Sequence, residues 1–173
     1  MNNEYEQKAS LLEDPSELRN FVKDRHGDQK RSQGTPYYEH PFAVADKLAE
    51  KGYGVGYQVA ALCHDLLEDT DTTYEELAGR VGADVANVVR LLTKEEGYQM
   101  ADYIKRIESN EMAKAVKLAD KLHNLSELHL ASKNFRERQI AETKQWYVEM
   151  AKGTPFEWEI MHLLEKLEND KDE

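Results

Sequence analysis

The helical spacing of apolar residues is the feature that most constrains the fold of this chain. In the segment 111–130, for example, Val116, Ala119 and Leu122 fall on one face of a helix, and similar spacing recurs almost throughout the chain. No segment shows convincingly the alternation of apolar and polar residues that is typical of a strand. With 173 residues, the chain is long enough to bury a sizeable core in one domain. We therefore predict an all-α, single-domain helical bundle over residues 1–173.

Start and stop signals divide this pattern into separate helices. Pro15 and Pro155 each suit the first turn of a helix, whereas glycine and proline make residues 27–39 a loop. Trp146 and Trp158 are expected in the core. The predicted helices span residues 4–13, 15–26, 40–51, 55–69, 73–82, 84–93, 98–109, 111–130, 134–151 and 154–168.

Composition limits the partners of the protein. Acidic residues outnumber basic residues by 34 to 23, and the net charge is −11, which argues against general affinity for nucleic acid or anionic membranes. The single cysteine, Cys63, excludes an intrachain disulfide. The N-terminal residues lack a signal pattern and no apolar run approaches the length of a membrane span, so we expect a cytoplasmic protein. The amphipathic helices leave both a monomer and an oligomer open.

The stretch 60–70 holds the densest group of reactive side chains. It carries the pair His64-Asp65 inside an apolar run, and Glu68 and Asp69 follow one turn later. On a helix these residues share a face, which would hold an imidazole and three carboxylates. Such packing is costly unless a cation neutralises the acids, and a divalent metal is the simplest such cation. A solvated acidic face is the alternative interpretation.

Two further residues are candidate partners of this pair. His40 precedes Pro41, which fixes the backbone at a helix start. Asp120 lies in a strongly apolar helix, on a face shared with Lys117 and Asn124, and a lone carboxylate there requires a metal or an arginine. Two imidazoles and two carboxylates suit Mn²⁺, with Fe²⁺ and Zn²⁺ as alternatives. With the acids nearby to move a proton, the set suits hydrolysis of a phosphoester or pyrophosphate.

The residues His40, His64-Asp65 and Asp120 stand in the order H…HD…D, which resembles the HD superfamily of metal-dependent phosphohydrolases. More closely, the chain resembles the hydrolase domain of the RelA/SpoT proteins and their small stand-alone relatives, including the metazoan SpoT homologues. HD alone is a weak motif, but four motifs in this order are specific. The similarity covers roughly residues 20–130 and lies in His26-x-x-Gln29-x-Arg31 and in the segments 34–41, 64–70 and 117–125.

The resemblance implies an HD-type helical bundle and a small-molecule nucleotide as substrate. The implied reaction is the Mn²⁺-dependent removal of the 3′-pyrophosphate from guanosine tetra- or pentaphosphate, (p)ppGpp, which gives GDP or GTP and pyrophosphate. Nothing similar to the synthetase domain fits in the remaining length, so synthesis is not expected. The implied metal ligands are His40, His64, Asp65 and Asp120, and the implied catalytic acids are Glu68 and Asp69. Arg31 matches the arginine that stacks on guanine, Asn124 matches an asparagine that contacts the nucleotide, and we add Lys30 and Lys117 as substrate-binding candidates.

The sequence departs from the family pattern where the nucleotide is expected to bind. Ser32 stands where the family usually has lysine, and Leu125-Ser126-Glu127 stands where it often has Met-Arg-Thr, so a cation is lost and an anion is gained. These changes leave open an HD phosphohydrolase that acts on another nucleotide, such as a nucleoside monophosphate, a different 3′-phosphorylated nucleotide or NADPH. A metal-bound nucleotide sensor without turnover is a further alternative, which the intact Glu68-Asp69 pair disfavours.

Overall fold

The computed structural model describes residues 14–169, and over this range the chain is all-α, as predicted. The predicted helix over 4–13 lies outside the described residues. Inside the predicted loop 27–39, an isolated bridge joins Lys30 to Pro36. Among the residues described, no helix is both long enough and apolar enough to cross a bilayer. The elements are α2 (Pro15–His26), α3 (Glu39–Glu50), α4 (Val55–Cys63), α5 (Leu66–Asp69), α6 (Tyr74–Val81), α7 (Ala83–Leu92), α8 (Met100–Glu108), α9 (Glu111–Glu127), the 3-10 turn η1 (Leu128–Leu130), α10 (Lys133–Glu142), the π-helical turn η2 (Thr143–Tyr147), α11 (Val148–Ala151) and α12 (Glu157–Asn169).

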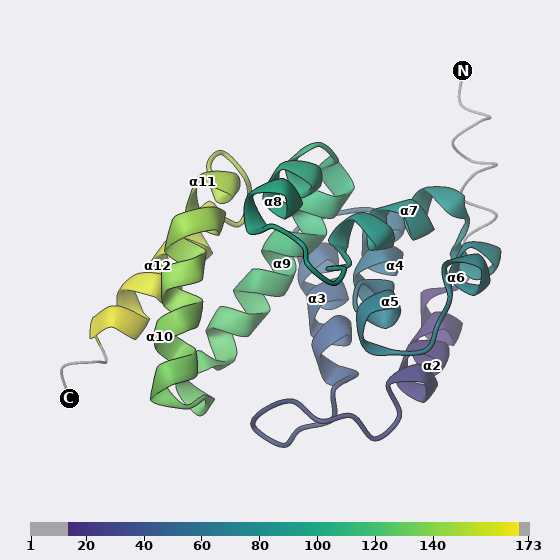
Figure 1. The fold of residues 1–173 in the computed structure, drawn as a ribbon, viewed down its shortest axis with the longest axis horizontal. Coiled ribbons are helices and arrows are strands. Elements are labelled where there is room, and N and C mark those ends of the chain that lie inside the picture. Colours follow the sequence, from purple (N-terminus) through teal and green to yellow (C-terminus); the bar gives the residue numbers. More distant parts are fainter. Residues whose placement is uncertain (1–13, 170–173) are drawn as a thin grey trace.

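Helix α9 is the element against which most of the others pack. Its N-cap is Asn110, whose side-chain oxygen accepts a hydrogen bond from the Ala113 N–H at 2.9 Å. Helices α3 and α4 lie on one side of α9 and α12 lies on the other, and Val116 and Leu118 are fully buried between them (Figure 1). Because α9 is covered on several sides, a polar residue such as Asp120 has to find its partners inside the protein.

The predicted helix over 55–69 is interrupted, and the prediction is wrong in that detail. Residues His64 and Asp65 separate α4 from α5. The His64 N–H donates to the Ala61 carbonyl at 3.3 Å, and the His64 ring nitrogen Nδ1 lies 2.6 Å from the same oxygen. A tighter turn therefore replaces the regular helical ladder at this point. The apolar spacing continues through the break, so periodicity does not reveal it.

The predicted helix over 134–151 is also divided, because the π-helical turn η2 stands between α10 and α11. The Thr143 hydroxyl donates to the Gln139 carbonyl at 2.7 Å where the turn begins. The wider turn carries Tyr147 into the core, where it is fully buried. Trp146 is partly buried and packs against this core.

The last helix begins later than the predicted span 154–168. The Thr154 hydroxyl accepts a hydrogen bond from the Phe156 N–H at 3.3 Å, and this local turn precedes α12. The placement of Trp158 in the core is wrong, because its side chain is 72% exposed. The buried face of α12 includes Ile160 and follows helical spacing, and Trp158 lies off that face.

Candidate functional site

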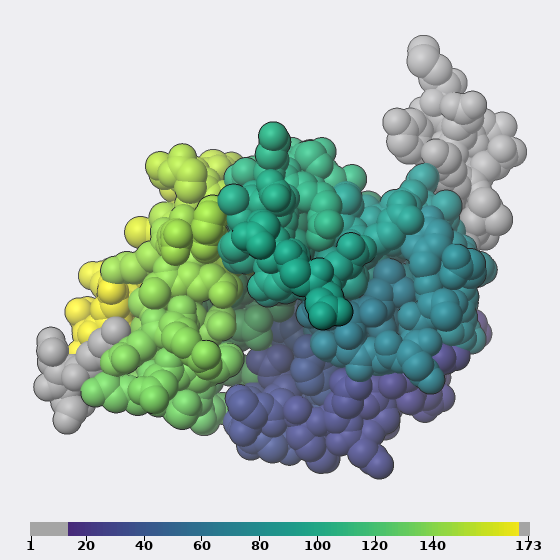
Figure 2. All heavy atoms as spheres, viewed as in Figure 1, coloured from purple at the N-terminus to yellow at the C-terminus, as the bar shows by residue number. Residues whose placement is uncertain are grey.

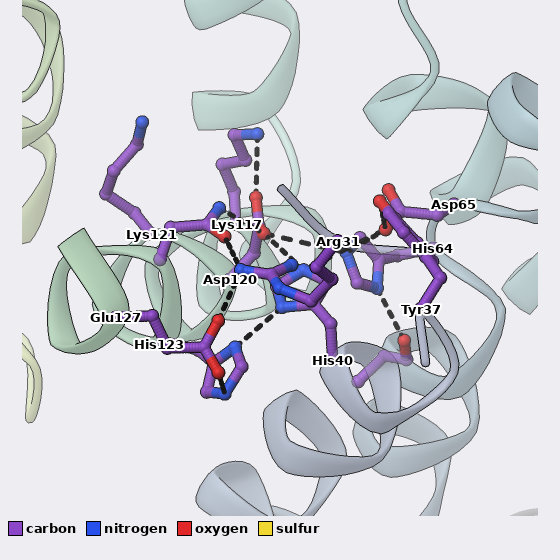
Figure 3. A network of polar contacts seen from close by, with 12 residues as sticks. Arg31, Tyr37, His40, His64, Asp65, Lys117, Asp120, Lys121, His123 and Glu127 are labelled. Atoms are coloured by element: carbon purple, nitrogen blue, oxygen red, sulfur yellow. Dashed lines mark hydrogen bonds and ion pairs between the residues drawn. The ribbon is translucent and has the colours of Figure 1, made fainter. Parts of the chain in front are cut away.

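Two histidines and two carboxylates from three separate parts of the chain meet in one cluster (Figure 3). His40 comes from α3, His64 and Asp65 come from the α4–α5 junction, and Asp120 comes from α9. The ligand atoms of His40, His64 and Asp65 all lie within 4.8 Å of one another. Asp120 Oδ1 lies 2.9 Å from His40 Nε2 and 3.7 Å from His64 Nε2. The structure thus brings the four predicted ligands together, and their role as ligands stays a prediction.

The ring of His64 is oriented so that one nitrogen faces the cluster. Its Nδ1 donates to the Ala61 carbonyl at 2.6 Å, so Nε2 carries the lone pair of the neutral imidazole. That Nε2 is buried and makes no hydrogen bond, although Asp65 Oδ2 lies 3.1 Å away. A buried nitrogen without a hydrogen-bond partner calls for an explanation, and a lone pair beside carboxylates fits a metal ion.

The charges of the cluster favour a cation between the acids. Burial opposes a charge on His64, yet the carboxylates of Asp65 and Asp120 outweigh burial and raise the pKa of this imidazole well above its usual value, so Nε2 holds a proton unless a metal ion takes its place. Burial also opposes ionisation of Asp120, but the Lys117 ammonium and the two imidazoles hold the pKa of that carboxyl well below its usual range. The acids are therefore ionised, and the space between them attracts positive charge of the kind that a divalent metal supplies.

His123, to which the sequence assigned no role, supports His40 from the side away from the cluster. The two Nδ1 atoms lie 2.7 Å apart. Burial and the neighbouring His40 lower the pKa of His123 to about 4, so its ring is neutral at pH 7. A hydrogen donated from His40 Nδ1 to His123 Nδ1 leaves the lone pair of His40 on Nε2, toward Asp120. His123 lies inside the family-like segment 117–125, but the sequence does not reveal its contact with His40, because His40 is distant in the chain.

The predicted catalytic acids Glu68 and Asp69 lie at the edge of this cluster. Their carboxylates and that of Asp65 have oxygens within 4.8 Å of one another. Glu68 Oε1 accepts the backbone N–H of Lys94 at 2.6 Å, which fixes the side chain. Burial, reinforced by the charges of Asp65 and Glu68, raises the pKa of Asp69 to about 6. A carboxyl with this pKa can exchange a proton near neutral pH.

Tyr37, which the sequence placed in a loop without a role, connects Asp69 to the cluster. Its hydroxyl oxygen lies 2.8 Å from Asp65 Oδ2 and 3.1 Å from Asp69 Oδ2. Burial and these carboxylates raise the pKa of the phenol far above its usual value, so the hydroxyl keeps its hydrogen. One donor thus serves two acids and fixes their spacing. In the sequence, Tyr37 lies in the family-like segment 34–41, three residues before His40, and neither fact reveals its contacts with Asp65 and Asp69.

A cleft of about 330 Å³ opens beside the cluster. Figure 2 shows the surface hollowed between α10 and the loop that precedes α3. Tyr37, Lys117 and Asn124 line the cleft and also bond to Asp65 or Asp120, so the cleft leads to the cluster. The predicted substrate-binding residues that line it are Lys30, Arg31, Lys117 and Asn124.

Cations dominate the lining of this cleft. Lys121, a lining residue that sequence analysis did not select, is buried and donates to Glu142 at 2.9 Å and to Gln139 at 3.1 Å. A chain with a net charge of −11 thus concentrates positive charge at one place, as a phosphate-bearing ligand requires. The charged residues of the lining are Lys30, Arg31, Lys94, Lys117 and Lys121, against Glu127 and Glu142.

Comparison with known proteins agrees with these features. A family model described as HD domain matches residues 19–154. The guanosine-3′,5′-bis(diphosphate) 3′-pyrophosphohydrolase MESH1 of Danio rerio is 37% identical over 144 residues, which cover 78% of this chain and 80% of that protein. The guanosine-3′,5′-bis(diphosphate) 3′-pyrophosphohydrolase of Aquifex aeolicus is 40% identical over 153 residues, which cover 84% of this chain. The match spans only 22% of the length of the Aquifex protein.

Solved structures show the same fold. A structure described as that of a metazoan ortholog of SpoT that hydrolyses ppGpp aligns with a TM-score of 0.77 and 27% identity, over 88% of this chain and 94% of that one. An HD domain implies a divalent metal, in agreement with the cluster of histidines and carboxylates. This chain is therefore a hydrolase of the HD domain family, and within it belongs to the family of the guanosine-3′,5′-bis(diphosphate) 3′-pyrophosphohydrolases.

Proposed function

We propose that this protein removes the 3′-pyrophosphate from guanosine tetra- and pentaphosphate, with Mn²⁺ as its metal. Relatives named for this reaction on ppGpp support the substrate. The observation that carries the proposal is the cation-lined cleft that leads to a cluster of histidines and carboxylates with an acid pair at its edge. A nucleotide that carries phosphates on both sides of its ribose needs such a concentration of cations.

His40, His64, Asp65 and Asp120 are the proposed metal ligands. Their mixture of imidazole and carboxylate donors suits Mn²⁺, and Fe²⁺ and Zn²⁺ are alternatives. When bound, a divalent ion polarises a phosphoryl oxygen and acidifies water. The hydrogen bonds of His64 to the Ala61 carbonyl and of His40 to His123 orient the two rings for this task (Figure 3 shows His123 beside His40).

Residues of the chain move the proton. Asp69, whose pKa is raised to about 6, accepts a proton from the attacking water, and Glu68, fixed by the Lys94 N–H, orients that water. A bond forms between the water oxygen and phosphorus, and the bond between phosphorus and the 3′ oxygen breaks. The proton then passes from Asp69 to the departing 3′ oxygen. The products are GDP or GTP and pyrophosphate.

The proposal is tested with purified protein and a panel of nucleotides that contains ppGpp, pppGpp, NADPH and nucleoside monophosphates. Mn²⁺, Fe²⁺ and Zn²⁺ are supplied in parallel, and products are separated by ion-exchange chromatography. We expect GDP and pyrophosphate in equal amounts from ppGpp, with the highest rate in Mn²⁺. Absence of pyrophosphate release from ppGpp with all three metals overturns the proposal.

A matched pair of histidine variants tests the metal centre. H64A removes a proposed ligand, and we expect loss of both bound metal and turnover. H162A changes a histidine that stacks on Trp158 at a ring distance of 5.0 Å, outside the cluster, and it should keep both. Elemental analysis measures the bound metal of each variant. Circular dichroism should be the same for the two variants, and this result excludes a general folding defect as the cause of metal loss in H64A.

A second candidate is hydrolysis of a different nucleotide at the same centre. The observation in its favour is Glu127, an anion in the cleft lining at a position where the RelA/SpoT pattern often has threonine. Release of inorganic phosphate from NADPH or a nucleoside monophosphate, faster than release of pyrophosphate from ppGpp, selects this alternative.

A further inference from the structure

His26 and Gln29 belong to the motif His26-x-x-Gln29-x-Arg31, and neither takes part in the proposed reaction. His26 is the last residue of α2 and its side chain is buried, whereas Gln29 lies three residues further, in the loop before α3. Helix α2 packs against the single turn of α5, which ends at the proposed catalytic acid Asp69 (Figure 1). His26 and Gln29 therefore lie beside the element that carries this acid.

The end of α5 needs a partner from outside the helix. The helix has only four residues, Leu66–Asp69, so its own hydrogen bonds are too few to fix its last residue. The side-chain amide of Gln29 donates a hydrogen bond to the Asp69 carbonyl at 2.6 Å. The carbonyls of a last helical turn have no partner within the helix, so Gln29 provides the donor that a longer helix would provide itself.

The same hydrogen bond fixes the orientation of the Gln29 amide. A carbonyl only accepts hydrogen bonds, so the amide nitrogen faces Asp69 and the amide oxygen faces His26. His26 Nδ1 lies 3.1 Å from that oxygen and has to donate to it. Burial lowers the pKa of His26, so the ring is neutral at pH 7 and carries its single hydrogen on Nδ1. His26 is thus the donor that holds the Gln29 amide toward Asp69.

His26 also supports the residue that binds the carboxylate of Asp69. The ring of Tyr37 lies 4.9 Å from the ring of His26, and the Tyr37 hydroxyl lies 3.1 Å from Asp69 Oδ2. The Tyr37 N–H donates to the Gln29 carbonyl at 2.8 Å, and the Gln29 N–H donates to the His26 carbonyl at 3.1 Å. The four residues form a closed ring of contacts, in which Asp69 is held at both its carbonyl and its carboxylate.

We propose that His26 and Gln29 are positioning residues, which hold the carboxylate of Asp69 in place through the Asp69 carbonyl and the Tyr37 ring. Neither residue lines the cleft, so both act through Asp69 and not on the substrate. A proton acceptor has to lie within hydrogen-bond distance of the water that it deprotonates, so its position affects the rate of the reaction. The inference rests on the proton-transfer role proposed above for Asp69.

The first test replaces Gln29 by methionine, which has a similar length and cannot donate to the Asp69 carbonyl. Gln29 is partly exposed, so Q29M should fold. We expect kcat for ppGpp to fall roughly tenfold, because a displaced acid accepts the proton poorly, while KM and bound metal keep their wild-type values. Arg31 lies two residues after Gln29, so a rise of KM at unchanged kcat would mean that Gln29 only shapes this loop, and it would overturn the inference.

A matched control and a double variant separate the position of the acid from general stability. Gln58 makes the same kind of hydrogen bond in α4, from its amide to the Tyr53 carbonyl at 3.1 Å, and Q58M should keep the wild-type kcat. In the D69N background, the Q29M change should have little further effect on kcat, because the acid through which Gln29 acts is already lost. An equal fall of kcat with and without the Asp69 carboxylate overturns the inference.

Two variants of His26 separate its hydrogen bond from its ring. H26N places an amide nitrogen near the position of Nδ1 and can still donate to Gln29, whereas H26F keeps a ring against Tyr37 and cannot donate. We expect H26N to keep more of the wild-type kcat than H26F, since the donor fixes the amide that binds Asp69. The reverse order contradicts the role of the His26 hydrogen bond.

A measurement without nucleotide keeps this test separate from the identity of the substrate. The Asp69 and Thr70 N–H groups donate to the Asp65 and Leu66 carbonyls at 2.9 and 3.2 Å, and in Q29M these two amide hydrogens should exchange with solvent several-fold faster. If wild-type protein does not hydrolyse ppGpp, kcat is measured with the nucleotide that it hydrolyses fastest, and a lower kcat with faster exchange then contradicts the substrate and supports the role of Gln29. A wild type that hydrolyses ppGpp, with neither kcat nor exchange changed in Q29M, contradicts the role of Gln29 alone.

Discussion

Replacement of Tyr37 by phenylalanine tests how the carboxylates of Asp65 and Asp69 are held. The Tyr37 hydroxyl lies 2.8 Å from Asp65 Oδ2 and 3.1 Å from Asp69 Oδ2. Burial and the neighbouring acids raise the pKa of Asp69 to about 6, and the hydrogen bond from Tyr37 opposes that rise. A hydrogen bond to a charged group contributes about 1.5–3 kcal/mol, and here two acids share one donor. A share of about 1 kcal/mol for Asp69 corresponds to a rise of about 0.7 in its pKa when the hydroxyl is removed.

The sign of the effect follows from the role proposed for Asp69. The carboxylate must be ionised to accept a proton, so a higher pKa moves the acidic limb of the kcat/KM profile to higher pH. Y37F should therefore lose several-fold in activity near pH 6 and little at pH 8. The assay is pyrophosphate release from ppGpp over this pH range.

The neighbouring residue supplies the control. Tyr38 packs its ring on Phe42 at a distance of 5.4 Å, so Y38F should keep the wild-type profile. Superimposable profiles of Y37F and wild type would refute the shared-donor argument.

Three further perturbations follow from the same geometry. The double variant E68Q/D69N should lower turnover by two orders of magnitude or more and keep the bound metal, and unchanged turnover would remove the proton-transfer role from Glu68 and Asp69. Removal of metal with a chelator should abolish activity and lower Tm, since an ion at 100 times its Kd stabilises the fold by about 2.7 kcal/mol, and Tm measured with and without added Mn²⁺ checks this. L118A opens a cavity at a fully buried position of α9 and should cost about 2–5 kcal/mol of unfolding free energy in urea denaturation, whereas W158A, at a side chain 72% exposed, should cost far less.

The parts of the molecule that sequence analysis predicted are those whose chemistry is local. Helical spacing of apolar residues requires a helix in almost any surroundings, so the all-α class follows from it. The pair His64-Asp65, His40 and Asp120 were selected by residue type and order, and they do meet in space. These side chains are buried, and an unpaired charge is unfavourable in a buried position, which is the reason the sequence predicted a metal there.

The parts that sequence analysis missed depend on contacts between distant residues. Nothing near Tyr37 in the chain indicates that its hydroxyl reaches Asp65 and Asp69, and nothing near His123 indicates His40. The apolar residues around Trp158 suggested burial, but the packing of α12 decided which face is covered. Glu127 was recognised as an unexpected anion, and only the structure shows that its partner is Arg31. 

The break between α4 and α5 limits how this protein can be made more stable. In an unbroken helix, adjacent side chains point about 100° apart, whereas the break at His64 and Asp65 brings the ligand atoms of both residues within 4.8 Å of each other and of His40. Asp65 has φ −101° and ψ −3°, which depart from the values of a regular α-helix. Engineering that favours a continuous helix here would raise thermal resistance and weaken metal affinity at once, an exchange that paired melting and metal-titration curves would reveal.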